Sequence, residues 1–194
     1  MGVGVAVQIR DLTITGGGDG SDYFEAGLWH TGGHIEVRNC RFTGNNVGIF
    51  TWCFDSNCDA VLTATNSIFD HNLRIAVDAN EHAIHHLINN TIVANGRGVA
   101  LNNTGSRIEN SIVVHNTHEG VGGNNAPTVR YNDVWSNGCN YSGVAAGPGD
   151  VSLDPLFEDE GAGDYRLQIG SPVLDAGNLA VEYNDRNVGL KPSS

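Results

Sequence analysis

The strongest constraint in this sequence is a short segment that recurs six times and aligns without a gap. The copies are DLTITGG (11–17), NCRFTGN (39–45), NSIFDHN (66–72), NNTIVAN (89–95), NSIVVHN (110–116) and YNDVWSN (131–137). Their first residues are 28, 27, 23, 21 and 21 positions apart. A repeat of this length is typical of a solenoid, in which each repeat packs on its neighbours.

Each repeat predicts two short strands that meet at a corner. Apolar residues alternate just before the segment, as at Val7 and Ile9, and again inside it, as at Leu12 and Ile14, but the two alternations are one residue out of phase. The residue at this slip is of a type that accepts left-handed backbone angles in five repeats: Asp11, Asn39, Asn66, Asn89 and Asn110. The sixth repeat has Tyr131 there and fits the pattern least well.

A second corner and a third strand follow each segment. Five segments end in asparagine, at Asn45, Asn72, Asn95, Asn116 and Asn137. Stacked asparagine amides can bond to the backbone of the neighbouring coil, so we expect an asparagine ladder at this corner. The third strand is predicted at 27–28, 48–49, 76–77, 98–99 and 120–121.

Three short strands in about 21 residues, without a helical period, predict an all-β fold. We expect a single-stranded right-handed parallel β-helix of about six to seven coils, with like residues stacked about 4.8 Å apart. A β-sandwich with asparagine-rich turns is the alternative, although hairpin folds need no fixed repeat length. Residues 1–149 are assigned to the coils, and residues 150–194 to a less regular C-terminal capping segment of the same domain.

The two ends of the predicted solenoid differ. The C-terminal segment offers Leu156, Phe157, Leu167 and Val173 to close the last coil. The N-terminal residues enter a strand at once, without an amphipathic helix to cover the first coil. Because an uncovered coil exposes core and unpaired backbone, we expect a homodimer or other homo-oligomer that forms through the N-terminal coil.

Composition excludes some partners. The formal net charge is −12, with one lysine and nine arginines, which disfavours nucleic acid and anionic lipid. Apolar runs are too short to span a membrane, and the first residues do not have the pattern of a secretion signal.

The chain resembles the bacterial right-handed parallel β-helix repeat proteins of the pectate-lyase-like superfamily. The resemblance covers the coils and the tail segments 154–157, 164–167 and 171–177. It implies the fold and a secreted or cell-surface location. It does not fix an activity, because such relatives include polysaccharide lyases, hydrolases, epimerases and adhesins. Members usually have more coils and an export signal, so this chain is expected to be a fragment or a minimal version.

Catalysis on an acidic sugar would need a base and a cation that holds the developing charge. One row of outward positions offers such groups: Arg10, Arg38, Glu36, Thr63 and His86, with Arg41 nearby. The alternative is a surface ladder with an Arg–Glu pair.

A histidine and carboxylate cluster follows in the third and fourth coils. It contains His71, Asp78, Glu81, His82, His85 and His86. A metal site and an acid–base site are alternatives to a solvated loop, which the irregular spacing favours. Asp78 and Glu81 are the carboxylates to inspect for glycosidase chemistry, although the Asp-Asp and Gly-His-Gly signatures of β-helix pectinases are absent.

Two further features concern calcium and disulfide bonds. The loop 16–22 has the glycine and aspartate content of calcium loops, with Asp19 and Asp22 as candidate ligands, but it lacks EF-hand spacing. No cofactor is expected otherwise. Cys53 and Cys58 bracket four residues and are a candidate disulfide pair in an exported protein.

The aromatic residues give the clearest indication of a binding surface. Seven of the 14 lie between Tyr23 and Phe54. Trp29 and Phe50 are predicted to point outward on adjacent coils, with Trp52 close by. Together with Asp78, Asn80 and Glu81 on the next coil, they predict a platform for sugar rings. A protein contact and local packing under Tyr23, Phe24 and Phe54 are the alternatives.

We therefore expect a protein that binds a carbohydrate or another surface polymer. A polysaccharide lyase or epimerase is the enzymatic alternative, and a structural interaction module without catalysis is the third. The sequence favours a protein without catalysis but leaves the question open.

Overall fold

The computed structural model describes residues 7–18, 20–22, 25–55 and 57–180. Eighteen strands form three parallel sheets, which we name A, B and C. Sheet A contains β1 (Val7–Arg10), β4 (His34–Arg38), β7 (Val61–Thr65), β10 (Ile84–Ile88), β13 (Arg107–Glu109) and β16 (Thr128–Arg130). Sheet B contains β2 (Thr13–Ile14), β5 (Arg41–Thr43), β8 (Ile68–Asp70), β11 (Thr91–Val93), β14 (Ile112–Val114) and β17 (Asp133–Trp135). Sheet C contains β3 (Ala26–His30), β6 (Val47–Thr51), β9 (Ile75–Ala79), β12 (Val99–Leu101), β15 (Glu119–Gly123) and β18 (Cys139–Ser142).

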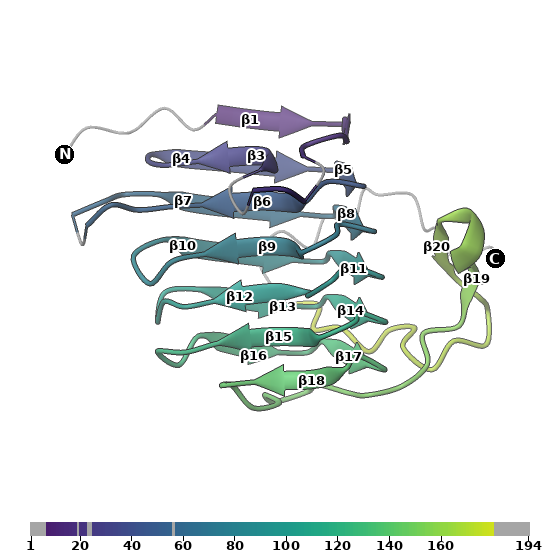
Figure 1. The fold of residues 1–194 in the computed structure, drawn as a ribbon. Helices are drawn as coiled ribbons and strands as arrows, with labels where there is room; N and C mark the ends of the chain where they lie inside the picture. Colours follow the sequence, from purple (N-terminus) through teal and green to yellow (C-terminus); the bar gives the residue numbers. More distant parts are fainter. Residues whose placement is uncertain (1–6, 19, 23–24, 56, 181–194) are drawn as a thin grey trace.

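The chain visits the three sheets in turn, so the strands stack into a right-handed β-helix (Figure 1). This confirms the predicted all-β parallel solenoid. Each sheet has six strands, and the chain therefore makes about five complete turns between the first and the last strand of a sheet. The predicted count of six to seven coils is slightly too high. Within the described residues, no helix is long and apolar enough to cross a membrane.

The core is built from inward rows in which each residue stacks on its counterpart in the next coil. The rows are Val37, Ala64, Leu87, Ile108 and Val129 on sheet A; Phe42, Phe69, Ile92, Val113 and Val134 on sheet B; and Ile49, Val77, Val99 and Val121 on sheet C. Burial of each large aliphatic or aromatic side chain contributes about 1.5–3 kcal/mol. The parallel register thus turns a sequence repeat into one continuous core.

The corner between sheets A and B has a left-handed residue in every coil. Asp11, Asn39, Asn66, Asn89, Asn110 and Tyr131 have φ angles between 50° and 57°. The sixth repeat thus keeps the corner although its residue is a tyrosine. The Tyr131 N–H donates to the Pro148 carbonyl at 3.0 Å, so the chain that follows the last coil holds this backbone in place. That contact offsets a steric cost of about 1–2 kcal/mol for a non-glycine residue in this region.

The corner between sheets B and C contains the predicted asparagine ladder. The Oδ1 atom of Asn95 accepts from the backbone N–H and the side-chain amide of Asn72, at 3.0 Å and 2.8 Å. The Asn95 amide donates in turn to Asn116 Oδ1 at 3.0 Å and to the Phe69 carbonyl at 2.9 Å. The same pattern links Asn45 to Asn72 and Asn116 to Asn137. Each buried amide therefore satisfies polar groups of two coils.

A second ladder, which the sequence analysis did not predict, runs along the corner between sheets A and B. Ser67, Asn90, Ser111 and Asn132 each follow a left-handed residue, and each side chain accepts a hydrogen bond from the backbone N–H of its counterpart one coil earlier, at 3.0–3.1 Å. The Cys40 N–H is the first donor of this series, and Asp150 Oδ1 is the last acceptor, from the Asn132 N–H at 2.8 Å. Side-chain oxygens thus accept hydrogen bonds from backbone N–H groups that do not take part in the strand pairing at this corner.

The segment 143–154 closes the last coil. The Val151 N–H donates to the Asn132 carbonyl at 2.8 Å, and the Val134 N–H donates to the Val151 carbonyl at 3.0 Å. Asp150 accepts from the Asn132 backbone and amide, which ends the second ladder. The C-terminal edge of the solenoid is therefore hydrogen-bonded to the chain itself.

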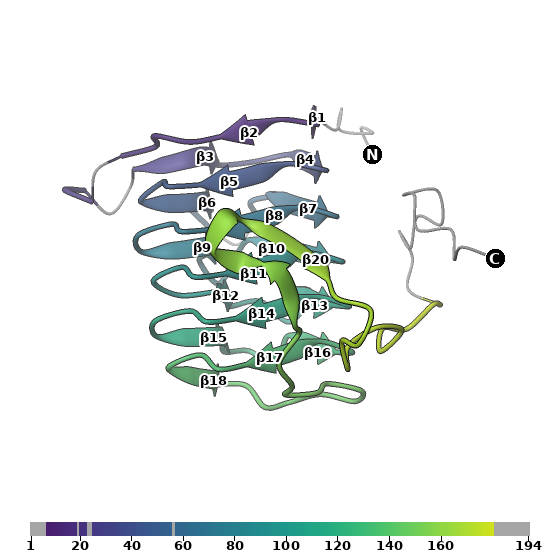
Figure 2. The ribbon, with the colours of Figure 1, turned by 90° about the vertical axis from the view of Figure 1, so that its right-hand side faces the viewer.

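The remaining tail lies on the outer face of sheet B (Figure 2). It forms an antiparallel pair, β19 (Phe157–Asp159) and β20 (Asp164–Leu167), joined by the 3-10 helix η1 (Glu160–Ala162). We expected Leu156, Phe157, Leu167 and Val173 to close the last coil. The structure instead packs Phe157 and Leu167 against the side of the solenoid, over Val93 and Val114. Apolar character indicated burial but not which surface the tail covers.

Asp70 anchors this tail. Its carboxylate is fully buried and accepts from Arg41 Nε at 3.0 Å, from the Tyr165 hydroxyl at 2.9 Å and from His71 Nδ1 at 3.0 Å. Burial alone would raise the pKa of Asp70, but the bonds from Arg41, His71 and Tyr165 hold it below its usual value. Because the carboxylate stays ionised and paired, it fixes β20 to sheet B.

Replacement of Asn95 by alanine tests the ladder. We expect Asn95→Ala to lower the free energy of unfolding by about 3–4 kcal/mol, because it leaves buried groups of Asn72 and Phe69 without partners. Asn124→Ala, at an exposed asparagine, should change it by less than about 0.5 kcal/mol. Urea unfolding provides the measurement, and equal losses in the two variants would contradict the role of the ladder.

Asp133 makes folding stability depend on pH. It is buried, and its Oδ2 atom has no hydrogen-bond partner among the described residues, while Oδ1 accepts from the Leu153 N–H at 3.0 Å. Burial raises the pKa of Asp133 from 3.8 to about 6, and the negative charge of Asp154 adds to this shift. The folded state therefore favours the protonated carboxyl, and this contribution to stability is lost as pH rises through 6.

We expect Asp133→Asn to be more stable than the wild type by about 1–2 kcal/mol at pH 7.5, because the variant carries no buried charge. The difference should disappear below pH 4, where both side chains are neutral. Unfolding free energies of both proteins between pH 4 and 8 provide the comparison. A stability difference that does not change with pH would show that Asp133 does not titrate in this range.

Candidate functional site on the outer face of sheet C

The outward positions of sheet C form one row along the solenoid. Trp29 lies opposite Phe50, Phe50 opposite Asp78, and Ala100 opposite Gly122, which lies opposite Ser142. Large aromatic residues therefore occupy the N-terminal coils of this face, and small residues occupy the C-terminal coils. Asp78 lies at the boundary between the two halves.

The aromatic half consists of Trp29, Phe50 and Trp52, which we call the aromatic strip. The Trp29 and Phe50 ring centroids are 5.9 Å apart in an edge-on arrangement, and Phe50 and Trp52 stack at 5.9 Å. Phe50 is only 2% exposed, whereas Trp29 is 52% and Trp52 37% exposed. Phe50 therefore forms the base of the strip, and the two tryptophans present ring surface to solvent.

Local packing, one of the alternatives from the sequence, describes Phe50. Phe50 packs against Val47 and Ile75 in an apolar cluster outside the main core. In the local-packing alternative, Phe54 would fold back over Trp29 and Phe50, whereas the Phe54 side chain is 80% exposed. Tyr23 and Phe24 lie outside the described residues.

The other half of the row forms the floor of a cleft of about 370 Å³, which we call the sheet-C cleft. Ala100 and Gly122 have little or no side chain, so they leave space between the longer side chains around them. The charged side chains of its lining are Arg74, Arg97, Glu119 and Asp78, and further polar groups come from Asn102, Asn124 and Ser142. Arg97 Nε lies 2.9 Å from Glu119 Oε2, so the lining includes an ion pair between successive coils. The cleft is therefore lined by positively charged, negatively charged and neutral hydrogen-bonding side chains.

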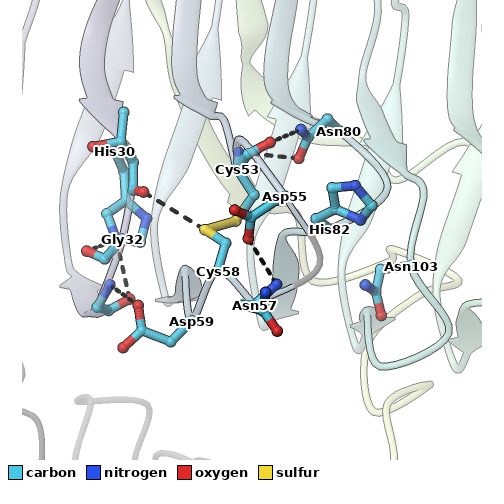
Figure 3. The surroundings of a disulfide bond; sticks show 12 residues. His30, Gly32, Cys53, Asp55, Asn57, Cys58, Asp59, Asn80, His82 and Asn103 are labelled. Atoms are coloured by element: carbon cyan, nitrogen blue, oxygen red, sulfur yellow. Dashed lines mark hydrogen bonds between the residues drawn. A yellow bond between two sulfur atoms is a disulfide. The ribbon is translucent and has the colours of Figure 1, made fainter.

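A disulfide closes the loop that follows the aromatic strip (Figure 3). Cys53 and Cys58 are joined in a disulfide with Cα atoms 5.5 Å apart. The Cys53 N–H donates to Asn80 Oδ1 at 3.2 Å, and the Asn80 amide donates back to the Cys53 carbonyl. On the other side, Asp59 Oδ1 accepts from the Gly33 N–H at 2.9 Å. The loop that begins with Trp52 is thus tied to the coil before it and the coil after it.

Asn80 and Glu81 do not join Asp78 at the strip, although we predicted the three as neighbours of a sugar. The Asn80 amide bonds to Cys53, and Asn80 therefore has a structural role in the loop. Glu81 lies in the turn after β9 and lines a separate hollow with Asn103 and Asn125. Of the three predicted polar neighbours, the sheet-C cleft includes Asp78.

The candidate catalytic residues are divided between two faces of the solenoid. Arg10 and Arg38 lie opposite each other on sheet A, and His86 lies in the neighbouring row beyond Glu36 and Thr63. Asp78 belongs to sheet C and Glu81 to a turn. The structure therefore does not bring these residues together into one site.

The histidine cluster is also dispersed. His71 bonds to Asp70 on sheet B, whereas His85 is fully buried in strand β10. Burial lowers the pKa of His85 to about 3, with smaller effects from His30 and His86, so His85 is neutral at physiological pH. Burial also lowers the pKa of His86, followed by the charge of Arg107. A solvated loop is thus the wrong description of His85.

The structure provides no new support for calcium. Within the described residues, no group of three or more histidine, cysteine or acidic side chains is placed to hold a metal ion. Asp19 lies outside the described residues. The N–H groups of Gly20 and Asp22 both donate to the Glu25 carboxylate, at 3.2 Å and 3.4 Å. Calcium in this loop remains a prediction.

Sequence reasoning missed the cleft because its residues come together only across coils. Arg97 and Glu119 occupy equivalent positions in successive repeats, as the register of β12 with β15 shows. That equivalence was the available signal, but one charged pair at a 22-residue spacing is indistinguishable from a surface ladder. The contribution of Ala100 and Gly122 lies in their small volume, which has no signature in a single sequence.

The fold is that of a parallel β-helix, but the chain has no detectable relative in the comparisons. No protein-family model, curated protein or solved structure matches it. Any functional conclusion therefore depends on the geometry of the site.

Alanine substitutions should show how differently Phe50, at the base of the strip, and the two exposed tryptophans contribute to the free energy of unfolding. We expect Phe50→Ala to lower the free energy of unfolding by about 3–4 kcal/mol, because it empties a buried aromatic site. Trp29→Ala and Trp52→Ala should each cost no more than about 1 kcal/mol. Chemical denaturation of the three variants provides the test. A loss above 3 kcal/mol in both tryptophan variants would identify the strip as a packing cluster.

Proposed function

We propose that the outer face of sheet C binds a carbohydrate chain or another elongated surface polymer. The proposal depends on one observation: an exposed aromatic strip and a polar cleft lie end to end in one row of the same sheet. Neither half alone would distinguish a polymer site from an ordinary surface.

The two halves suit different parts of a sugar. Exposed tryptophan rings provide flat apolar surface for the C–H faces of a pyranose, and buried aromatic support keeps them rigid. Amide, hydroxyl and charged side chains provide donors and acceptors for sugar hydroxyls. Asn102, Asn124 and Ser142 in the sheet-C cleft offer both kinds of group.

The dimensions favour a chain over a compact ligand. The row from Trp29 to Ser142 crosses six strands, which corresponds to roughly 24 Å along the solenoid at about 4.8 Å per strand. A polymer that lies parallel to the solenoid axis would contact the strip and the cleft at once. A single sugar ring would reach only one of them.

The family and location are part of the same proposal. The parallel coils, the left-handed asparagines and the asparagine ladder support a relationship to the pectate-lyase-like superfamily. The Cys53–Cys58 disulfide supports an oxidising compartment, where such bonds persist. A secreted or cell-surface location would also place the protein next to polysaccharides.

A polysaccharide lyase or epimerase is the second candidate function. The observation in its favour is that Arg74 and Arg97 line one cleft with Asp78 and Glu119. Such a reaction needs a base that removes a proton and a cationic group that stabilises the negative charge on the sugar. The ion pair between Arg97 and Glu119 weighs against this role, because it engages the arginine. A structural interaction module is the third candidate, with a protein partner on the aromatic strip.

Tryptophan fluorescence of tryptophan-to-phenylalanine variants tests the binding proposal. The chain has three tryptophans, and Trp135 lies on sheet B, away from the strip. Trp135→Phe retains Trp29 and Trp52, whereas Trp29→Phe/Trp52→Phe retains Trp135 as the matched control. Each variant is titrated with a panel of neutral and acidic polysaccharides. We expect a saturable change in the first variant and none in the second.

The outcomes distinguish the candidate functions. Unsaturated ends together with new reducing ends after incubation with the bound polysaccharide would favour the lyase, and inversion of a sugar carbon without chain cleavage would favour the epimerase. Absence of a response across the panel, or an equal response from Trp135 alone, would contradict carbohydrate binding at the strip.

A further inference from the structure

The two ends of this solenoid are not equivalent. At the C-terminal end, the segment 143–154 pairs with the last coil through the Val151, Val134 and Tyr131 backbone groups, at 2.8–3.0 Å. At the N-terminal end, β1, β2 and β3 are the outermost strands of the three sheets. No strand of the described chain pairs with their outer edges. One end is thus closed by the chain itself, whereas at the other end the described residues leave one strand edge of each sheet unpaired.

The first coil also leaves its apolar residues incompletely covered. Ile9, Ile14 and Leu28 are only partly buried, whereas their counterparts in the second coil, Val37, Phe42 and Ile49, are at most 1% exposed. Val7 and Leu12 of the first coil are 55% and 54% exposed. Coverage by one further layer would give this coil the burial that the second coil has.

The three edge strands lack the features that usually prevent edge pairing. Their sequences are VQIR, TI and AGLWH, and they contain no proline, no lysine and no acidic residue. Natural edge strands are commonly protected by such residues. In a chain with a net charge of −12, these strands carry one formal charge, on Arg10. Electrostatic repulsion between copies is therefore weak at this end.

We propose that the first coil is a self-association surface that binds the first coil of a second copy of this chain. A second copy of the first coil presents the same three strand edges around the same apolar core, so each edge can pair with an edge of the other copy. The closed C-terminal end cannot supply that match, because the segment 143–154 already lies on it. The contact is therefore head to head. It relates the two copies by a two-fold axis and pairs their edges antiparallel, and a contact of this symmetry closes at a dimer.

Charged substitution at an exposed residue of the first coil tests this surface without disturbing the core. Leu12→Lys places a charge on the first coil, and Leu73→Lys is the matched control at a leucine of 62% exposure on the third coil. Sedimentation velocity of the whole chain, over a concentration series centred on about 10 µM, measures the dimer dissociation constant. We expect Leu12→Lys to raise that constant at least tenfold and Leu73→Lys to leave it unchanged.

Small-angle X-ray scattering of the wild-type chain then fixes the geometry of the dimer. A head-to-head dimer should be elongated, with a maximum dimension close to twice that of the monomer. A monomer throughout the concentration series would overturn the proposal. A side-by-side dimer of unchanged length, or a dimer that Leu73→Lys disrupts and Leu12→Lys does not, would overturn it as well.

Discussion

The fold depends on hydrogen bonds between buried side chains at the corners of the coils. A parallel solenoid must turn its backbone sharply three times per coil, and backbone groups at these turns cannot all join a strand ladder. Asn72, Asn95 and Asn116 supply the missing partners, each of them bonded to the coil before and the coil after. The second ladder, through Ser67, Asn90 and Ser111, does the same at the preceding corner. Both ladders keep equivalent residues in register, and the stacked core depends on that register.

The same register creates the candidate site. Because every coil places its outward residues above those of the next, a face of the solenoid can change its chemistry gradually along the axis. On sheet C it changes from Trp29 and Phe50, through Asp78, to the small residues over which the cleft opens. Longer turns are added where the aromatic residues lie, and the Cys53–Cys58 disulfide restrains the turn between β6 and β7. The corners thus determine which side chains share a surface.

Much of this architecture could be predicted because solenoid coils obey local rules. Left-handed positions at Asn39 and Asn66, and the asparagines that follow each second strand, are visible in one sequence because each coil repeats them. The second ladder was missed because its acceptors vary among serine, asparagine and aspartate, so the hydrogen bond repeats along the solenoid while the residue type does not. The tail was misplaced because Phe157 and Leu167 indicate burial without specifying a partner surface. The sheet-C cleft escaped prediction because it arises from the contrast between Ala100 or Gly122 and the longer side chains beside them.

Native-state hydrogen exchange, measured by NMR, tests the role of the ladder most directly. The informative groups are the backbone N–H of Asn72, Asn95 and Asn116, which donate to side chains rather than to another strand. If the ladder holds the coils in register, these protons should exchange only through global unfolding, with the same free energy as core amides of sheet B. Exchange through local openings several kcal/mol below that value would show that the corners open independently, and it would contradict the account.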